Sequence, residues 1–258
     1  LAARNGVKVV LDGQGSDEIM GGYMHSMYRV VADLLRSGRI GEAAAEVQAH
    51  ATRQSYGMRR RLDVLAKSLL AAARDEQALY ELEFTRTAPW IMAQPAAAYP
   101  ITLGMPSGPR LNAFLHNLLR VTLLPTLLHT EDINSMAFSI ESRVPFLDHR
   151  LVDFCFSLPN EHKIYRGETK RVLRAGMRGI VPDAVLDRKD KTGFITPGHV
   201  AWLRGALSHL LDGDWNDLDG YIRPSAIRPL ITAYRNGDNR HALFVWRLAM
   251  LRAFVRSL

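Results

Sequence analysis

The sequence contains one cysteine, Cys155, and no uncharged apolar run long enough to cross a membrane. A single cysteine excludes a disulfide framework and a cysteine-based zinc site. Because Cys155 lies in the apolar, helix-like segment LVDFCFSL, we expect a buried thiol. Arg4 and Lys8 flank no apolar stretch of the kind that signal peptides carry. These absences favour a cytosolic, cytoplasmic protein with no membrane partner.

The charge balance is basic, with 33 Lys and Arg residues against 26 Asp and Glu and a net charge of +7. Most basic residues are scattered; the exceptions are Arg59 to Arg61 and residues 188–191, and no aromatic residues alternate with them. Stacking on nucleic-acid bases needs such aromatics, so we expect no nucleic-acid partner. A positive field equally suits ATP and pyrophosphate. With 258 residues and 47% hydrophobic content, the chain has enough apolar side chains for a large core.

The most informative segment runs from Val7 to Tyr23 and reads VKVVLDGQGSDEIMGGY. Its apolar, β-branched beginning, Val7 to Leu11, predicts a short strand buried on both faces. Asp12, Gly13, Gln14 and Gly15 end that strand. The two glycines permit positive φ angles and let a ligand approach the main chain closely.

An acidic helix start follows this turn. Ser16 suits the N-cap position, and Asp17 and Glu18 then fall in the first helical turn, where carboxylates are stabilised. The same carboxylates are ligands of the kind that Mg²⁺ uses together with phosphate oxygens. Gly21 and Gly22 indicate that another element or a ligand lies against this helix. An ordinary capped strand-to-helix turn is the alternative interpretation of the same residues.

Two ordered blocks identify a family resemblance. LDGQGSDEIMGGY resembles the strand-loop-helix signature in the synthetase (ATP pyrophosphatase) domain of glutamine-hydrolysing asparagine synthetases and related amide-forming enzymes. Glu131 to Asp148, EDINSMAFSIESRVPFLD, resembles the second signature of that family. The resemblance implies an α/β fold of the adenine nucleotide α-hydrolase type. Residues 1–258 would form the distal part of that domain, predominantly α-helical with about one core strand.

The resemblance also implies roles for individual residues. Lys170, in a G-x-x-K-x-x-L-R segment, would reach the α-phosphate and acyl oxygens, and Asp17 would help to hold Mg²⁺. Gln14 would face the acyl-adenylate, and Asp132 matches a carboxylate that helps to deprotonate the attacking amine in ring-closing relatives. The nucleotide would lie on the loop formed by Asp12, Gly13, Gly15 and Ser16.

The second block has structural expectations of its own. Asp148 suits the N-cap of a helix that runs to Leu158, and Glu141 and Arg143 either pair with each other or reach the nucleotide. We expect the apolar side chains of this block to be buried, namely Val144, Phe146 and Leu147.

Helical periodicity dominates the remaining sequence. His116 and His129 have no carboxylate or cysteine at metal-binding spacing, so we expect them on polar helix faces. Pro89 to Pro109 is expected to form a long loop. In the basic loop Asp187 to Pro197, Lys189, Lys191 and Gly193 either touch phosphates or are solvent-exposed. Helices are expected at Tyr28 to Leu35, Glu42 to Arg53, Leu62 to Arg74, Leu111 to His129 with a break at Pro125, Gly167 to Arg174, and Leu243 to Leu258.

Several parts of the family pattern are absent from this sequence. The pyrophosphate loop S-G-G-x-D-S and the glutaminase domain do not occur in it, so we expect a missing N-terminal half or partner chain and no ATP turnover by this chain alone. Unpaired strand edges would favour association, either with that partner or as a homodimer. Gln14 stands where the best-known asparagine synthetases have glutamate, and Ile133 stands where the pattern has arginine.

The resemblance therefore predicts a carbon-nitrogen ligase. It would form an amide through an acyl-adenylate, using MgATP, aspartate or another carboxylate, and ammonia from a glutaminase domain. Asparagine would be the product. Gln14 also fits an amide-forming cyclase or amidotransferase acting on a peptide or natural product, and a non-catalytic degenerate partner is the third alternative.

Overall fold

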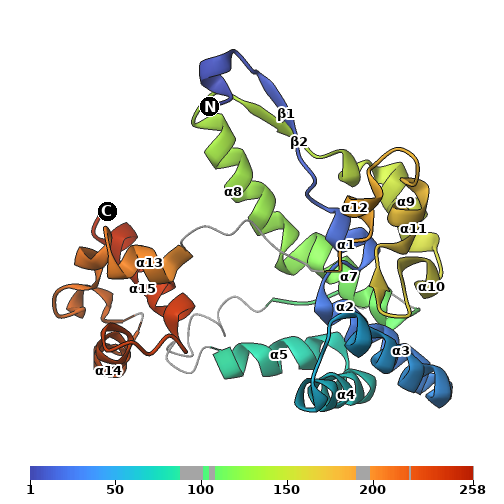
Figure 1. Cartoon of the computed structure of the whole chain (residues 1–258). Helices are drawn as coiled ribbons and strands as arrows, with labels where there is room; N and C mark the ends of the chain where they lie inside the picture. The colour runs from blue at the N-terminus through green and yellow to red at the C-terminus, as the bar shows by residue number, and fades with distance from the viewer. Residues whose placement is uncertain (88–100, 105–107, 190–197, 221, 258) are drawn as a thin grey trace. The chain divides into compact units, whose positions relative to one another are not determined.

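The computed structural model describes residues 1–87, 101–104, 108–189, 198–220 and 222–257 (Figure 1). The chain divides into two compact units. Unit 1 comprises residues 1–81 and 101–191, and unit 2 comprises residues 82–100 and 192–258. The described residues are predominantly helical, as predicted, with four short strands among them. None of the helices in this part of the chain is long and apolar enough to cross a membrane.

The two signature segments meet in a parallel pair of strands. Strand β1 (Val9–Leu11) pairs with β2 (Glu141–Arg143), and Val9 lies opposite Glu141. The prediction of a strand buried on both faces is wrong, because Val9 is 39% exposed and Leu11 is 74% exposed. The physical reason is that no third strand pairs with β1 or β2 within the described residues. The second strand, within the second signature, was not predicted.

Helices cover most of the chain before residue 190, and the predictions for residues 28–35, 42–53 and 62–74 are confirmed. The packed interior of unit 1 gathers around Met27, Val31, Leu111 and Leu115. The helices are α1 (Ser16–Met20), α2 (Met24–Arg36), α3 (Ile40–Arg53), α4 (Met58–Ala73), α5 (Glu76–Thr87), α7 (Arg110–Asn117), α8 (Leu124–Met136), α9 (His149–Ser157), α10 (Asn160–Lys163), α11 (Arg171–Gly176) and α12 (Asp183–Leu186).

The helical stretch after residue 110 is interrupted, but not at Pro125. A π-helical turn, Leu118–Thr122, follows α7, and α8 begins at Leu124 with Pro125 in its first turn. Proline is tolerated there because its missing N–H would have no partner within the helix. His116 is half-buried on α7 and His129 is exposed on α8. The described part of the expected loop 89–109 consists of residues 101–104 and 108–109 only.

A small hairpin replaces the beginning of the helix predicted at Gly167. Strand β3 (Ile164–Tyr165) pairs antiparallel with β4 (Glu168–Thr169). The turn between them places Arg166 at φ 49° and Gly167 at φ 71°, so neither can belong to a right-handed helix. Helix α11 consequently begins at Arg171, after Lys170.

The second signature continues from β2 through a short 3₁₀ turn, Pro145–Leu147, into α9. The prediction for Asp148 is confirmed, because its Oδ1 accepts a hydrogen bond of 2.9 Å from the Arg150 N–H. Three apolar residues of the block are half-buried rather than fully buried, namely Val144, Phe146 and Leu147. Cys155 on α9 is 1% exposed, as expected, and burial raises the pKa of its thiol.

Unit 2 is a small helical unit with its own apolar core. The predicted C-terminal helix is present as α15, and its residues Val245 and Leu248 are buried together with Trp215 and Ile227. Its elements are α13 (Gly198–Arg204), the 3₁₀ turns Ser208–Leu211 and Asn216–Leu218, α14 (Pro224–Arg235) and α15 (Ala242–Val255).

Candidate active site in unit 1

The turn after β1 presents the first residues of α1. Gly15, at φ 94°, occupies the N-cap position, so the prediction of Ser16 as the N-cap is wrong and Ser16 is the first helical residue. The left-handed backbone conformation at the N-cap favours glycine, so Gly15 rather than Ser16 takes this position. Asp17 and Glu18 lie in the first turn, as predicted. Backbone N–H groups and the helix dipole therefore favour negative charge at this end of α1.

Lys170 comes from a distant part of the chain and reaches this helix start. Its Nζ lies 2.8 Å from Asp17 Oδ1 and donates a 3.0 Å hydrogen bond to Ser16 Oγ. The Lys170 side chain is 22% exposed and that of Asp17 is 15% exposed. Three of the residues predicted from the family resemblance are thus brought together, and the ammonium group remains partly open to solvent.

Gly22 makes room for this contact. A Cβ atom at residue 22 would lie 1.6 Å from Asp17 Oδ1 and 2.6 Å from Lys170 Cε. Only glycine therefore allows the carboxylate and the lysine to occupy their positions. The expectation that another element lies against the glycine pair is confirmed, because Ile164 packs on Gly21 in the same way.

Glu18, the second carboxylate of α1, points into the protein. It is 1% exposed and accepts a 2.6 Å hydrogen bond from the Tyr23 hydroxyl. Burial, followed by this hydrogen bond and the charges of Glu18 and Asp17, raises the pKa of Tyr23, so its proton stays in place. Because Glu18 is buried, Asp17 is the carboxylate of α1 that lies where a metal ion could be held.

The loop between β1 and α1 is held by hydrogen bonds and has open space beside Gly13. The Gln14 N–H donates to Asp12 Oδ1 over 2.9 Å, and the Asp12 N–H donates to the carbonyl of Arg143 over 2.8 Å. No described atom lies within 4 Å of a Cβ built on Gly13. The main chain at Gly13 is therefore accessible, as a nucleotide-binding loop requires.

Glu131 lies beside this loop, a residue that the sequence interpretation missed. It accepts a 2.8 Å hydrogen bond from Ser142 Oγ and interacts with the side chains of Asp12 and Gln14. Burial and the neighbouring Asp12 carboxyl raise the pKa of Glu131. Two carboxyl groups in contact favour retention of one shared proton.

Asp132, the predicted base, is exposed on α8, and its carboxylate contacts no other side chain among the described residues. One residue along a helix rotates the side chain by about 100°, so Glu131 and Asp132 face different directions. The sequence did contain one signal for Glu131, the alternation of side chains along β2. Ser142 must face away from Glu141 and Arg143, and on that face it meets Glu131.

The charged pair of the second signature has a structural role here. Arg143 Nε lies 2.7 Å from Glu141 Oε1, and both side chains are more than half exposed. This geometry agrees with the expectation that the two residues pair with each other. Ile133 is likewise exposed, with 56% of its surface accessible.

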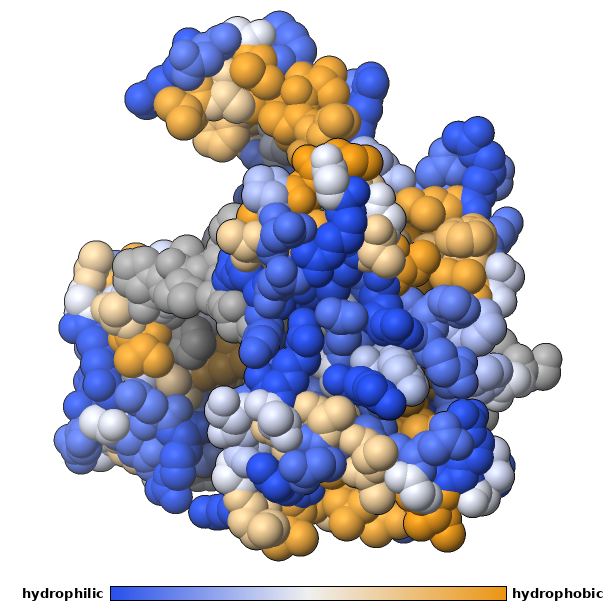
Figure 2. Space-filling model, turned by 45° about the vertical axis from the view of Figure 1, so that its right-hand side comes forward, coloured by the Kyte–Doolittle hydropathy of each residue, from blue (hydrophilic) through white to orange (hydrophobic). Residues whose placement is uncertain are grey.

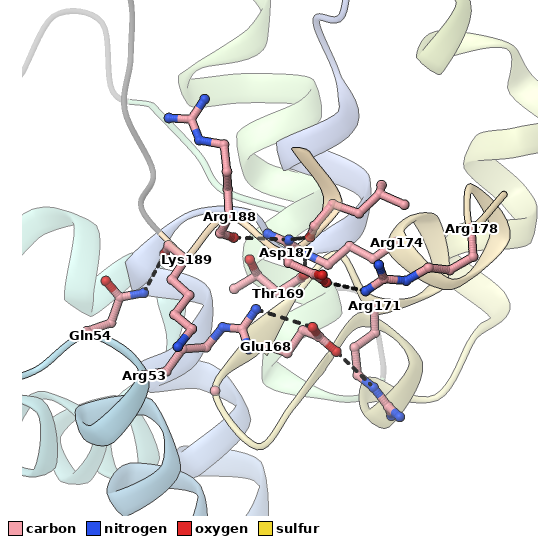
Figure 3. Close-up of polar contacts among 12 residues, drawn as sticks. Arg53, Gln54, Glu168, Thr169, Arg171, Arg174, Arg178, Asp187, Arg188 and Lys189 are labelled. Carbon is pink, nitrogen blue, oxygen red and sulfur yellow. Dashed lines mark hydrogen bonds and ion pairs between the residues drawn. The ribbon is translucent and has the colours of Figure 1, made fainter. Parts of the chain in front are cut away.

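A basic cluster joins α3 to the segments on both sides of Lys170 (Figure 3). Glu168 accepts from Arg53 over 3.3 Å and lies 3.6 Å from Arg171, so one carboxylate joins α3, β4 and α11. Arg174 donates to the Thr169 carbonyl over 2.9 Å. Burial, reinforced by the charge of Arg53, lowers the pKa of Arg174. Three arginines thus lie around the single carboxylate of Glu168, in the segment that adjoins Lys170 in the sequence.

The same cluster holds the beginning of the predicted basic loop. Arg174 Nη1 donates to the carbonyls of Leu186 and Arg188, and Gln54 Nε2 donates to the carbonyl of Lys189 over 2.8 Å. Lys191 and Gly193, which were predicted alternatives for phosphate contact, lie outside the described residues. Periodicity could not predict these bonds, because the acceptors are main-chain atoms.

Comparison with known proteins supports the interpretation of both signatures. The family described as asparagine synthase matches residues 1–256. The chain is 38% identical over 87 residues to asparagine synthetase [glutamine-hydrolyzing] 3 of Bacillus subtilis, covering 34% of this chain and 14% of the relative. It is 29% identical over 245 residues to asparagine synthetase [glutamine-hydrolyzing] 1 of the same organism, covering 89% of this chain and 37% of the relative.

The chain thus spans well under half the length of the curated relatives that it matches. No solved structure matches it significantly. The family match extends over nearly every residue, including both signatures and the Lys170 segment. The chain belongs to the asparagine synthase family.

Proposed function

We propose that this chain contributes the acyl-activating site of an ATP-dependent amide ligase, with asparagine as the product. A carboxylate oxygen of aspartate attacks the α-phosphorus of ATP and pyrophosphate leaves; ammonia derived from glutamine then attacks the acyl carbon and AMP leaves. The observation that carries the proposal is the position of the Lys170 ammonium, 2.8 Å from Asp17 at the start of α1.

Lys170 is suited to both steps, because each builds negative charge on phosphate or acyl oxygens. A positioned ammonium group lowers the free energy of such a charge, and its partial exposure lets a substrate reach it. Its αL backbone angle, φ 53°, is uncommon for a residue with a side chain. Strained backbone of this kind is concentrated at functional sites.

The residues present fit magnesium-bound ATP. Asp17 would hold Mg²⁺ together with phosphate oxygens, and the open main chain at Gly13 would face the nucleotide with Asp12, Gly15 and Ser16. When bound, Mg²⁺ neutralises phosphate charge. Arg53, Arg171 and Arg174 supply further positive charge beside Lys170, which favours the binding of pyrophosphate and ATP.

A second candidate function is amide formation on a peptide or natural product. Gln14 and Asp12 both lie beside the Glu131 carboxyl. The glutamine cannot itself act as a base, but the neighbouring carboxyl can accept a proton from an attacking amine. This arrangement favours a substrate other than aspartate and ammonia, and the choice of carboxylate substrate in the assay below separates the two.

The site requires chain beyond these residues, which we infer from the exposed strand pair. Apolar side chains gather where β1, β2 and the end of α8 lie, as Figure 2 shows at the top of the molecule. The exposed residues are Leu1, Val7, Val9, Leu11, Ile133, Met136 and Phe138. Unpaired strand edges beside such a patch promote association. The remainder of the synthetase domain would extend this sheet; a stable monomer in sedimentation equilibrium would contradict this inference.

The test measures AMP and pyrophosphate formed from MgATP with aspartate and ammonium. The chain alone is compared with the chain joined to its upstream coding region. We expect activity only in the joined form, with a loss of at least about 100-fold in Lys170→Met and Asp17→Asn. Lys67→Met is the matched control, because Lys67 forms an exposed ion pair with Asp63 on α4.

Three other outcomes have defined meanings. If the joined form releases AMP with another carboxylate but not with aspartate, the ligase mechanism holds and asparagine is the wrong product. Full activity in Lys170→Met contradicts the proposed role of the lysine. No AMP with any carboxylate in the joined form favours a non-catalytic partner.

A further inference from the structure

Three residues of the segment 166–170 adopt left-handed backbone conformations. Arg166 has φ 49°, Gly167 has φ 71° and Lys170 has φ 53°. Arg166 and Gly167 are the two central residues of the β3–β4 hairpin, since Tyr165 pairs with Glu168. A two-residue hairpin turn with positive φ at both positions favours asparagine followed by glycine, so arginine at residue 166 is an unfavourable choice. Backbone strain of this kind persists only where surrounding groups hold it.

A buried carboxylate on α3 holds this turn. Glu46 is 5% exposed, and its two oxygens accept hydrogen bonds of 2.7 Å from the backbone N–H groups of Arg166 and Gly167. Hydrogen bonds to an ionised acceptor are roughly twice as strong as neutral ones. Glu46 therefore compensates the unfavourable conformation of the turn, and its removal would leave two N–H groups without this acceptor.

The main chain of α3 also lies directly against the turn. A Cβ atom on Gly167 would lie 2.6 Å from the Cα of His50 and 2.8 Å from its backbone nitrogen, so only glycine fits against the helix. Further along α3, Arg53 donates to Glu168 of β4 over 3.3 Å (Figure 3). Helix α3 is therefore the support of the hairpin, and Glu46 is the residue on it that binds the turn.

The hairpin leads directly to the lysine of the proposed reaction site. Lys170 follows β4, and α11 begins at the next residue. On the other strand, Ile164 packs on Gly21 at the end of α1. The hairpin thus connects α3, where Glu46 binds it, with α1, where the Lys170 ammonium lies 2.8 Å from Asp17. Because only the two residues of β4 separate the turn from Lys170, a shift of the turn should lengthen this ion pair.

We propose that Glu46 is a positioning residue for Lys170. By binding the two N–H groups of the β3–β4 turn, Glu46 keeps the left-handed backbone in place and holds the Lys170 ammonium at the start of α1. The consequence for catalysis rests on the proposed function, whereas the effect on the position of Lys170 does not. Glu46 itself touches no substrate, because its carboxylate is buried against the hairpin and already accepts from two donors.

The reactivity of Lys170 in the 258-residue chain measures its position. Acetylation by an N-hydroxysuccinimide ester, followed by peptide mass spectrometry, gives the rate at Lys170 relative to Lys67, whose side chain is 41% exposed. Glu46→Gln keeps one acceptor oxygen of the two. We expect it to raise the relative rate at Lys170 at least about threefold, because the lysine nitrogen leaves Asp17. Lys163, which is 0% exposed, should stay unreactive.

Three further variants sharpen the test. Glu42→Gln is the matched control, because Glu42 is exposed on the same helix and pairs with Arg39; it should leave the rate at Lys170 unchanged. Arg166→Asn gives the turn a residue that favours positive φ, and combined with Glu46→Gln it should restore the low rate. Glu46→Asp keeps the charge but shortens the side chain, and it takes the place of Glu46→Gln if that variant does not fold.

An unchanged relative rate at Lys170 in a folded Glu46 variant would overturn the proposal, as would an equal rise in Glu42→Gln. Equal rises at Lys170 and Lys163 would show a general opening of unit 1 and would also overturn it. In the chain joined to its upstream region, Glu46→Gln should lower kcat for AMP release about tenfold. If the joined form releases no AMP but Glu46→Gln still raises the rate at Lys170, the positioning role holds and the proposed function fails.

Discussion

The two units use an ion pair in different ways. In unit 2, Arg252 is 1% exposed, its Nε lies 3.0 Å from both carboxylate oxygens of Asp217, and its guanidinium lies 4.4 Å from the centre of the Trp215 ring. It also donates to the carbonyl of Asp212. In unit 1, Lys170 has 22% of its side chain exposed and contacts Asp17 and Ser16 only at its terminal nitrogen.

The difference separates a charge that holds a fold from a charge that is available for chemistry. The planar guanidinium of Arg252 is fixed by an acid, a carbonyl and a ring, so a ligand has no access to it. In the proposed function, the ammonium of Lys170 would exchange its contact with Asp17 for contacts with a substrate oxygen. The following predictions test this contrast, from the largest expected effect to the smallest.

Arg252→Met should lower the free energy of unfolding of unit 2 by about 4 kcal/mol, because it removes the buried member of an ion pair and leaves Asp217 and the Asp212 carbonyl with fewer partners. Asp217 would keep only Arg256, whose side chain is 54% exposed. Urea titration followed by tryptophan fluorescence measures the loss. Lys67→Met is the control, with an expected change under about 0.5 kcal/mol. If Arg252→Met also changed the free energy of unfolding by less than about 0.5 kcal/mol, Arg252 would not hold unit 2 together and the contrast between the units would fail.

Lys163 extends the comparison, since it is a buried cation of unit 1 to which the described residues offer no carboxylate partner. It is 0% exposed and donates to Leu158 O over 2.7 Å and to Asn112 Oδ1 over 3.0 Å. Burial lowers the pKa of Lys163 to about 8, opposed by the charge of Cys155. The unfolded chain therefore binds more protons than the folded chain between pH 8 and the unfolded pKa of 10.5.

In that pH range, the free energy of unfolding contributed by Lys163 should rise with pH. Relative to Lys163→Met, the unmodified chain should gain about 3 kcal/mol between pH 7 and pH 10.5. Urea titrations of both proteins across this range measure their free energies of unfolding. The difference between the two values removes the contributions of titratable groups that both proteins share. Parallel stability curves would show that Lys163 keeps an ordinary pKa in the folded state.

Gly22→Ala should separate Lys170 from Asp17, because the new Cβ would lie 1.6 Å from Asp17 Oδ1. We expect a loss of about 2 kcal/mol in the free energy of unfolding, as for other overpacked positions. Gly13→Ala is the matched control from the same signature, since its Cβ would meet no described atom within 4 Å. Thermal unfolding of both variants measures the effect; equal losses would mean that the Lys170 site adapts freely.

Glu131→Gln has the smallest expected effect on the free energy of unfolding. It should stabilise the protein, whereas Arg252→Met and Gly22→Ala should destabilise it. The change removes a carboxyl whose pKa is raised by burial and by contact with Asp12. A raised carboxyl pKa means that the folded state loses stability as pH rises through the unfolded value. At pH 7 the variant should therefore be more stable by about 0.5 kcal/mol, and at pH 4 the difference should vanish. A destabilised variant at pH 7 would show that Glu131 is ionised and compensated.

The sequence predicted local features well where one residue type determines the geometry. Asp148 caps α9, Asp17 lies in the first turn of α1, and the helices of the Ala-rich region are present. The family resemblance singled out Lys170, Asp17 and Ser16, which the structure brings together, whereas the role of Lys170 in the reaction stays a prediction. These successes depend on capping, periodicity and ordered motifs, all of which are encoded within a few neighbouring residues.

The failures arise where distant segments decide the outcome. The apolar run at β1 predicted burial, but burial depends on neighbouring strands that the described residues do not provide. The positive φ angles at Arg166 and Gly167 moved the start of a helix to Arg171. The choice between Glu131 and Asp132 depends on the rotation of α8 about its axis, which the approach of β2 fixes and no pattern within α8 itself encodes.

The pairing of β1 with β2 also has a consequence for folding kinetics. Val9 meets Glu141 across a loop of about 130 residues, whereas α2, α3 and α4 pack on near neighbours in the chain. Closing that loop requires the intervening helices to be compact first, so the strand pair should form late. The loop that follows β1 is then among the last parts of the proposed reaction site to be fixed, and the bonds of Lys8 and Asp12 to the second strand extend its three-residue pairing by one residue at each end.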